Sequence, residues 1–331
     1  GGTSKLKRNS SAGGVLAPSA ANTRQEHSRD HWSLSHNGRW GWATSQVALT
    51  QEKGQRETYA QDRAGDYIRN ERAPEIKNTV LDAKLNTRLG DHFLVIGGQY
   101  NRGELTDQNP GRRTGVDEHF SIIQKALFVE DEWSLTDTLA LTAGLRADDH
   151  EIYGNHWSPR LYAVWHTSDA VTIKGGVSRG FRAPEIRNIA PGYAYTTGGG
   201  GCTYGPNGTC GVIIGDPDLK AETSTSYELS AHYNNKAGIQ ANATLFYTDF
   251  KDKVANALIY NDDGSIARWS EDPNYRLWYS YNIDDATIQG LELGLTWQPA
   301  RTLSFKSNYT YTDSEQKGGA YDGYALTRTP K

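Results

Sequence analysis

The sequence predicts an all-β protein, an antiparallel transmembrane β-barrel, and three observations favour this fold class. Apolar and polar residues alternate with period 2 in about twelve segments, which is the pattern of strands with one apolar face. The segments are joined alternately by short turns and long polar loops, which is the layout of outer-membrane barrels. Tryptophans gather near the short turns, where the interfacial aromatic girdle of such a barrel is expected.

The composition agrees with this fold class. The 331 residues are 36% hydrophobic and 11% aromatic, and the mean hydropathy is -0.70. No run of 18 apolar residues exists, so we expect no transmembrane helix, and the opening residues GGTSKLKRNSSAGG do not read as a signal peptide. The net charge of -4 makes nucleic acid an unexpected partner.

The strands are predicted from alternation such as that of 81–89, where Leu81, Ala83 and Leu85 alternate with Asp82 and Lys84. Residues 1–29 show no such pattern and are expected to be loop or linker. We expect strands near 30–38, 41–53, 76–89, 93–106, 119–135, 139–152, 157–167, 171–183, 222–234, 239–252, 284–297 and 302–314, and a thirteenth from about Tyr324.

The connections separate into two kinds. Tight-turn compositions occur at His36–Arg39, Gly90-Asp91, Thr136–Thr138, Ser168-Asp169, Asn234–Gly238 and Gln298–Arg301. Long polar loops are expected at 54–75, 107–118, 184–221, 253–283 and 315–323, and a short one at 153–156. In outer-membrane barrels the turns are periplasmic and the loops extracellular.

Five tryptophans support the barrel: Trp40, Trp42, Trp133, Trp165 and Trp297 lie within a few residues of a short turn. The alternative is a soluble β-sandwich in which these rings are core residues. The opposite face of most strands carries Asp, Lys, Arg and Glu, but the outer face of a sandwich could look the same. The alternation alone therefore leaves both architectures open.

The two cysteines, Cys202 and Cys210, lie in a glycine-rich loop. They predict one disulfide and an oxidising compartment, against the alternative of two free thiols in a cytosolic loop. Closing about nine residues constrains the unfolded chain by ~2–3 kcal/mol. We expect the disulfide to stiffen a loop tip that has no core to pack on, either to contact a ligand or to resist proteases.

Four segments resemble one family. They are VEDEWSLTDTLALTAGLRADDHEIYGNHWSPRLYAVW (129–165), VTIKGGVSRGFRAPEI (171–186), GDPDLKAETSTSYEL (215–229) and IQGLELGL (288–295). Together they resemble the barrel of TonB-dependent outer-membrane siderophore receptors, most closely the ferric catecholate receptors of the ferric enterobactin and colicin I receptor type. The resemblance covers roughly residues 30–331, and such receptors also tend to carry a cysteine pair in the loop before the Asp-Leu-Lys-x-Glu-Thr-Ser stretch.

The resemblance implies a 22-stranded barrel filled by a plug domain. This sequence departs from it, because it shows no plug segment, no TonB box and no terminal strand ending in an aromatic residue. We therefore expect an internal barrel fragment of about 12–13 strands, with two unpaired sheet edges and with the plug domain absent. Such edges are costly in lipid and prone to aggregate in water.

The resemblance also implies the function: TonB-dependent uptake of a ferric siderophore of catecholate type across the bacterial outer membrane, with this chain giving barrel wall and ligand-binding loops. No enzyme activity, bound metal or covalent cofactor is expected, and iron enters only within the ferric siderophore ligand. The implied partners are the siderophore, outer-membrane lipid, and TonB-ExbB-ExbD acting through a plug domain. Colicins and phage are further candidate users of the loops. The alternatives are a passive porin or surface adhesin barrel and a soluble all-β carbohydrate-binding protein.

A ferric catecholate is anionic and carries flat aromatic rings, so its site needs cations and π faces at the barrel mouth. The cationic candidates near the loop-side strand ends are Arg102, Arg160, Arg182 and Arg187. The aromatic candidates are Tyr153, Trp157, Phe181, Tyr193, Tyr195, Tyr204, Trp278, Tyr279 and Tyr281. For each one, an ordinary girdle aromatic or a solvated arginine is the competing explanation.

Other motifs carry no chemistry. Asp216–Glu222 lacks the ligand spacing of an EF-hand, and Gly176–Gly180 matches G-x-S-x-G but lies within a predicted strand. Gly198–Gly201 opens no helix and is not a phosphate cradle. His27, His31 and His36 cluster only loosely.

Overall fold

The computed structural model describes residues 1–10, 22–198, 202–318, 321–326 and 329, and in them sixteen strands form one sheet. The strands are β1 (Gly2–Ser10), β2 (Thr23–Arg39), β3 (Ala43–Gln61), β4 (Tyr67–Arg69), β5 (Glu75–Leu89), β6 (His92–Asp107), β7 (Glu118–Ser134), β8 (Leu139–His150), β9 (Gly154–His166), β10 (Val171–Arg182), β11 (Ala194–Thr197), β12 (Gly211–Ile214), β13 (Glu222–Asn234), β14 (Ile239–Leu258), β15 (Arg276–Ala300) and β16 (Leu303–Lys317). One short helix, α1 (Ile186–Ile189), follows β10.

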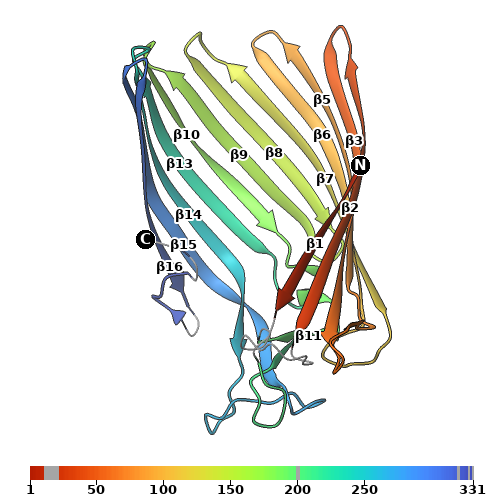
Figure 1. Ribbon diagram of the computed structural model, residues 1–331. Helices are drawn as coiled ribbons and strands as arrows, with labels where there is room; N and C mark the ends of the chain where they lie inside the picture. The colour runs from red at the N-terminus through yellow and green to blue at the C-terminus, as the bar shows by residue number, and fades with distance from the viewer. Residues whose placement is uncertain (11–21, 199–201, 319–320, 327–328, 330–331) are drawn as a thin grey trace.

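Thirteen of these strands form a curved wall, because β4, β11 and β12 are short strands within loops. Each wall strand pairs antiparallel with the wall strands before and after it in sequence. The short turns lie at one end of the wall, at the top of Figure 1, except the connection 151–153 between β8 and β9, which lies at the other end. The long loops lie at the other end. In the described residues β1 pairs only with β2 and β16 only with β15, so the sheet is open and the two expected unpaired edges are confirmed.

The twelve predicted wall strands are all present, but the start of the chain differs from the prediction. Within residues 1–29, β1 is a strand paired with β2, and β2 itself begins at Thr23, so the expectation of a loop was wrong for these segments. The reason is that β1 is polar on both faces, with Leu6 as its one large apolar residue, so it carries no period-2 signal. Residues 11–21 lie outside the described part.

The end of the chain also differs. No strand begins near Tyr324 in the residues that the structure describes. Instead this segment folds back along β16, with the Gly323 N–H donating to the Gln316 carbonyl and the Gln316 N–H to the Tyr324 carbonyl, both at 2.8 Å. Residues 199–201, within the predicted glycine-rich loop, are also outside the described part.

Several connections depart from the predicted boundaries. The loop predicted at 54–75 is 62–74, because β3 runs to Gln61, and the short loop predicted at 153–156 is 151–153. The turn predicted at His36–Arg39 is wrong, because β2 runs to Arg39 and the turn is 40–42, closed by the Trp40 N–H to the Ala43 carbonyl at 2.8 Å. The loop predicted at 253–283 shrinks to 259–275, because β14 and β15 extend far beyond the other strands. By contrast, the two-residue turn at Gly90-Asp91 is confirmed, with Gly90 at φ 60°.

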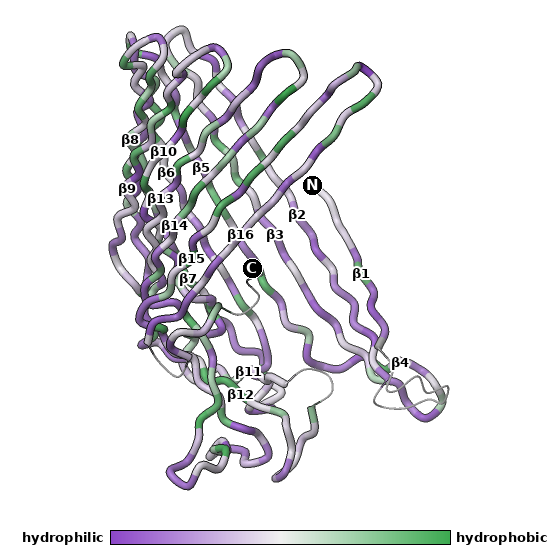
Figure 2. Tube along the Cα trace, turned by 90° about the vertical axis from the view of Figure 1, so that its left-hand side faces the viewer, coloured by the Kyte–Doolittle hydropathy of each residue, from purple (hydrophilic) through white to green (hydrophobic). Residues whose placement is uncertain are grey.

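The wall has one apolar and one polar face. Large apolar side chains point outward and stay exposed, as with Leu127 at 72%, while the next residues along each strand face the concave side. The concave side carries polar contacts such as Arg160 to Glu130 at 3.0 Å and Gln99 to Asp82 at 2.7 Å. Figure 2 shows hydrophilic and hydrophobic positions alternating along the strands.

The predicted tryptophan girdle is confirmed. The five tryptophans named above lie at the turn end and are 42–67% exposed. Trp133 stacks on His92 at 5.4 Å, and Trp297 stacks on Phe305 at 5.5 Å. Among the described residues, the structure has no helix of the length and apolarity needed to cross a membrane.

Three long loops fold together at the other end into what we call the loop cap, residues 108–117, 183–198, 202–221 and 259–275. Its centre is β12, which pairs parallel with β15 on one side and antiparallel with β11 on the other. A small core of Ala194, Cys210, Val212, Trp269 and Tyr275 holds the loops together.

Candidate functional site

A cavity of about 1010 Å³ lies between the concave face of β3, β5 and β6 and the loop cap. The wall supplies Arg56, Asn78 and Asn101, and the loops supply Arg72 and Tyr193. Its remaining polar and aromatic lining includes His27, Glu52, Gln55, Asp107, Gln124, His150, Glu185, Arg187 and Tyr195. The wall therefore forms one side of the cavity and the folded loops form the other.

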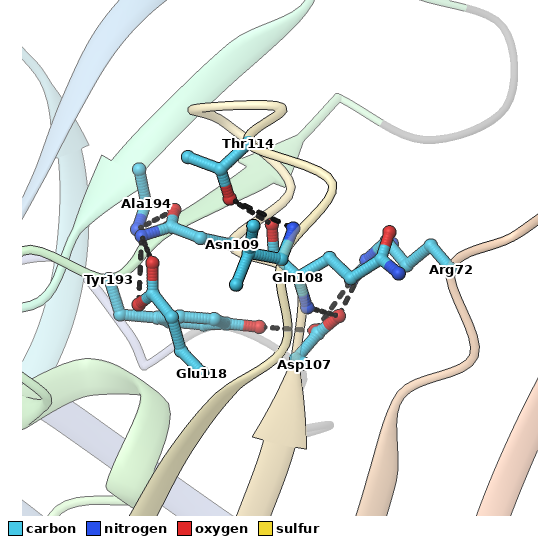
Figure 3. A network of polar contacts seen from close by, with 9 residues as sticks. Arg72, Asp107, Gln108, Asn109, Thr114, Glu118, Tyr193 and Ala194 are labelled. Carbon is cyan, nitrogen blue, oxygen red and sulfur yellow. Dashed lines mark hydrogen bonds and ion pairs between the residues drawn. The ribbon is translucent and has the colours of Figure 1, made fainter.

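A buried carboxylate joins the wall to the cap. Asp107, at the end of β6, accepts hydrogen bonds from Arg72 at 2.7 Å to each oxygen and from the Tyr193 hydroxyl at 2.6 Å (Figure 3). Burial raises the pKa of Asp107, but the bonds from Arg72 and Tyr193 outweigh it, so the pKa lies below its ordinary value. Burial, with the bond to Asp107, raises the pKa of Tyr193. The network thus fixes an ionised carboxylate beside a neutral phenol.

Asn109 holds the backbone that presents Tyr193 and Tyr195 to the cavity. Its Oδ1 accepts from the Ala194 N–H at 3.0 Å, and its Nδ2 donates to the Gly192 carbonyl at 3.1 Å. Asn109 adopts φ 49°, a left-handed conformation that asparagine tolerates better than most residues. The conformation and the contacts together dock the 108–117 loop on β11.

Arg56 is the least compensated cation of the cavity. It forms no ion pair with any described residue, and its Nε is buried without a hydrogen-bond partner. Burial, followed by repulsion from Arg72, lowers the pKa of Arg56, although a guanidinium stays charged at neutral pH. Because Arg72 is already neutralised by Asp107, the charge of Arg56 is available to an anionic ligand.

Aromatic faces lie beside these cations. Tyr193 meets Phe120 edge to face at 5.6 Å and lies 6.5 Å from the ring of Tyr195. The guanidinium of Arg187 is 5.4 Å from the Tyr195 ring and pairs with Glu185 at 2.8 Å. The cavity therefore combines cations with flat rings, as recognition of an anionic aromatic ligand requires.

Of the thirteen predicted site residues, the structure brings Arg187, Tyr193 and Tyr195 into this cavity. Arg182 lies in a small adjoining hollow and pairs with Glu222 at 3.4 Å. Phe181 stacks on His156 at 3.9 Å, and Tyr153 packs on His150, which lines the cavity, at 5.1 Å.

The other candidates lie elsewhere. Alternation along β6 and β9 puts Arg102 and Trp157 on the outer face of the wall, away from the cavity. Arg160 is held by Glu130 on the concave side, and Tyr204 bonds to Asp272 at 2.7 Å within the cap. Three more lie on β15, where Trp278 contacts the cap at Gly211 and the rings of Tyr279 and Tyr281 are 5.3 Å apart.

The structure also adds residues that the prediction missed, namely Arg56, Arg72 and Asp107. The available signal was weak: both arginines lie within the predicted loop 54–75, where any cation reads as solvated. Only the fold shows that β3 carries Arg56 on its concave face and that Arg72 reaches the end of β6.

The predicted Cys202–Cys210 disulfide is present. The expectation that its loop tip has no core was wrong, because Cys210 is 8% exposed and packs with Val212, Trp269 and Tyr275. Strand alternation puts His27 and His31 on one face of β2 and His36 on the other. The described residues contain no group of three or more potential His, Cys, Asp or Glu metal ligands.

An antiparallel wall with a lipid-type outer face, short turns at one end and folded loops over a polar cavity at the other defines an outer-membrane receptor barrel. The match of residues 6–331 to the family described as "TonB dependent receptor-like, beta-barrel" shows that the chain belongs to that family. This places the chain in the bacterial outer membrane.

Individual relatives agree. The chain is 36% identical over 313 residues to the iron-regulated outer membrane virulence protein of Vibrio cholerae, covering 94% of this chain and 44% of that protein. It is 29% identical to a ferric enterobactin receptor of Pseudomonas aeruginosa, covering 92% of this chain and 43% of that receptor. The crystal structure of the siderophore receptor PirA from Pseudomonas aeruginosa superposes with a TM-score of 0.74 and 27% identity, covering 89% and 52% of the two chains. The chain thus spans about half the length of the relatives it matches.

Proposed function

We propose that this chain supplies wall and ligand-binding loops to a receptor that takes up a ferric siderophore of catecholate type. The observation that carries the proposal is Arg56, a half-buried arginine in a cavity that Tyr193 and Tyr195 also line. Its Nε is buried without a hydrogen-bond partner, and it forms no ion pair with any described residue. A relative is named a ferric enterobactin receptor, and the structure of one such receptor contains enterobactin. These names support a catecholate as the ligand.

The cavity suits this ligand class. Sites for small molecules commonly enclose ~300–1,000 Å³, and this cavity encloses about 1010 Å³. Its lining has cations for the negative charge of a ferric catecholate and tyrosine rings for its aromatic groups. Iron enters as part of this substrate.

The energy for transport is part of the same proposal. Passage across the outer membrane would be driven by TonB with ExbB and ExbD, acting through a plug domain inside the completed barrel. The family match supports this coupling. A passive porin is the competing function, and it predicts permeation that continues after TonB is removed.

The test measures binding of the ligand to the intact receptor in detergent. The quenching of tryptophan fluorescence reports the binding. Ferric enterobactin should quench saturably, while a ferric hydroxamate and haem serve as controls. Arg56→Gln should weaken binding by about tenfold to a hundredfold, the loss expected for one charge-assisted contact.

Arg160→Gln is the matched control, because Arg160 also faces the concave side but lies outside the cavity and is paired with Glu130. It should bind almost as the wild type does. The siderophore proposal fails if no iron ligand quenches. The assignment of the site to this cavity fails if Arg56→Gln binds as tightly as Arg160→Gln.

A further inference from the structure

One histidine of the cavity lining has two ring nitrogens in different surroundings. His150 is the last residue of β8 and lies opposite Gln124 of β7 in the register. Alternation along β8, which lies between β7 and β9 in the wall (Figure 1), puts His150 on the concave side. Both His150 and Gln124 line the cavity, and Arg56 lines it from β3. His150 is nevertheless only 4% exposed, so the protein encloses almost all of its ring.

The turn that follows β8 uses one of these nitrogens. Nδ1 of His150 accepts from the N–H groups of Ile152 at 3.2 Å and of Tyr153 at 3.4 Å. Glu151 anchors the same turn on β7, since its N–H donates to the Ile123 carbonyl at 2.9 Å and its carboxylate accepts from the Ile123 N–H at 2.8 Å. A ring nitrogen that accepts from two N–H groups carries no proton, so the neutral ring of His150 holds its proton on Nε2.

The second nitrogen, Nε2, is open to the cavity. It has no hydrogen-bond partner among the described residues, yet it is not one of the buried side-chain atoms that lack a partner. The small exposure of His150 therefore includes Nε2, and the ring lines the cavity. Nε2 thus offers an N–H group to a ligand that occupies the cavity.

Neighbouring rings hold the imidazole in this position. The centroid of the His150 ring lies 5.1 Å from that of Tyr153 and 6.3 Å from that of Phe181, which meets it edge to face. Phe181 is itself stacked on His156 at 3.9 Å. These contacts and the two bonds at Nδ1 fix the direction of the Nε2–H group before a ligand arrives. Binding therefore loses little conformational entropy at this side chain.

A role in the turn does not account for the whole side chain. The side chain of Asn or Asp can accept from a backbone N–H two residues further along the chain, which is a common way to stabilise such a turn. His150 does this through Nδ1 but adds a donor on the other side of the ring. That donor is the part of the side chain that the turn leaves unused.

We propose that His150 is a ligand-binding residue of the cavity, where it donates a hydrogen bond from Nε2 to an anionic oxygen of the ferric catecholate. This inference rests on the function proposed above and adds a neutral, directional contact to the charge of Arg56. The iron-bound oxygens of a catecholate carry negative charge and no proton, so they can only accept. A cation attracts such a ligand from any direction, whereas a fixed N–H favours the one orientation that points an oxygen at it.

Three variants of the intact receptor in detergent separate the two nitrogens, with ferric enterobactin as the probe and tryptophan quenching as the measurement. Asn places its amide oxygen near the position of Nδ1, and Gln places its amide nitrogen near the position of Nε2. His150→Asn should therefore keep the turn and lose the contact, and it should weaken binding by about tenfold, as His150→Ala does. His150→Gln should regain most of the affinity.

Hydrogen exchange in 151–157 reports the state of the turn in the same variants. Exchange should be as slow in His150→Asn as in the wild type, because an acceptor for the N–H groups of Ile152 and Tyr153 remains. It should be faster in His150→Gln, which lacks that acceptor. The affinity and the protection of the turn should thus change in opposite ways, whereas a residue that acted only through the turn would change both together.

His166→Asn is the matched control. His166 is the last residue of β9, at the turn end of the wall, and it lies outside the cavity. Alternation puts it on the concave side, as it does His150. The variant should bind ferric enterobactin as the wild type does and leave exchange in 151–157 unchanged.

Two results would overturn the proposal and leave the siderophore function in place. In the first, the wild type binds ferric enterobactin and His150→Asn binds it as tightly, so that Nε2 makes no contact. In the second, His150→Gln binds no more tightly than His150→Ala, so that a donor at this position is not used. If the wild type binds neither ferric enterobactin nor the ferric hydroxamate and haem controls, the proposed function fails and this inference fails with it.

Discussion

The wall and the loop cap are built in opposite ways. In the wall every strand pairs with its neighbour in sequence, and the large apolar side chains face outward. In the cap the contacts join distant segments: Asn109 bonds to Ala194, and Arg113 donates to the Tyr275 hydroxyl at 2.8 Å. The wall is therefore built for contact with lipid, and the cap is built to be stable in water. Changes that damage one should leave the other intact.

The largest expected effect is a charge placed on the lipid face of the wall. Leu127→Arg puts a cation near the middle of the apolar band, and such changes cost ~2–4 kcal/mol in transmembrane barrels. Val116→Arg makes a comparable change at a residue of the cap that is 65% exposed, and it should cost close to nothing. Urea-driven unfolding of the intact receptor from vesicles measures both. Equal costs would show that the two regions do not differ in this way.

Breaking the disulfide should have the next largest effect, and in the cap alone. Replacing Cys202 and Cys210 by serine frees a loop of about nine residues, which costs ~2–3 kcal/mol. Hydrogen exchange at neutral pH should accelerate in 202–221 and 259–275, because Cys210 packs in the core that both segments share. Exchange in β5–β10 should be unchanged, and faster exchange there would show that the cap also stabilises the wall.

The same difference explains what the sequence predicts. Period-2 alternation identifies wall strands because lipid contacts every second residue, and all twelve of those predicted are present. It fails at β1, where neither face is apolar. It also fails at the turn after β2, where His36–Arg39 has a turn composition but pairs with Thr44–Val47 as strand.

The site was predictable only in part. A rule that seeks aromatic and cationic residues in loops finds Tyr193, Tyr195 and Arg187. It cannot find Asp107, which is neither cationic nor aromatic, and it cannot tell Arg56 from the other cations of the predicted loop 54–75, because the role of both residues depends on which loops meet across the cavity. Nor can it separate the two faces of a strand near its end, and so it also selects Arg102 and Trp157.

A smaller effect is expected from the cation that joins the three loops. Arg113 lies 4.1 Å from the Tyr204 ring and 5.4 Å from the Tyr275 ring. Arg113→Ala removes a cation–π contact and a hydrogen bond, each worth ~1 kcal/mol at partly exposed sites. Exchange in 259–275 should accelerate several-fold, less than in the serine variant. The neighbouring Arg112→Ala removes only the exposed pair with Glu271 and should change little. If Arg113→Ala accelerates exchange no more than Arg112→Ala does, Arg113 does not hold the loops of the cap together.

The smallest effect at neutral pH, and the most specific, concerns protonation of the Asp107–Tyr193 pair. The pKa of Tyr193 is raised by burial and by Asp107, so its stabilising contribution is complete below the ordinary pKa of 10.0 and is lost as pH rises through the higher folded value. The pKa of Asp107 is lowered despite burial, by Arg72 and Tyr193, so its contribution is complete above 3.8 and is lost only as pH falls below that value. The contribution of this pair to the stability of the cap should therefore be constant between these limits and should be lost at alkaline pH. Tyrosinate absorbance of the wild type minus that of Tyr193→Phe isolates this phenol, and its midpoint should lie above pH 10, as the raised pKa requires. A midpoint at or below 10 would mean that the Asp107 bond does not persist in solution, and the cavity would then lack the tyrosine face on which ligand recognition is proposed to depend.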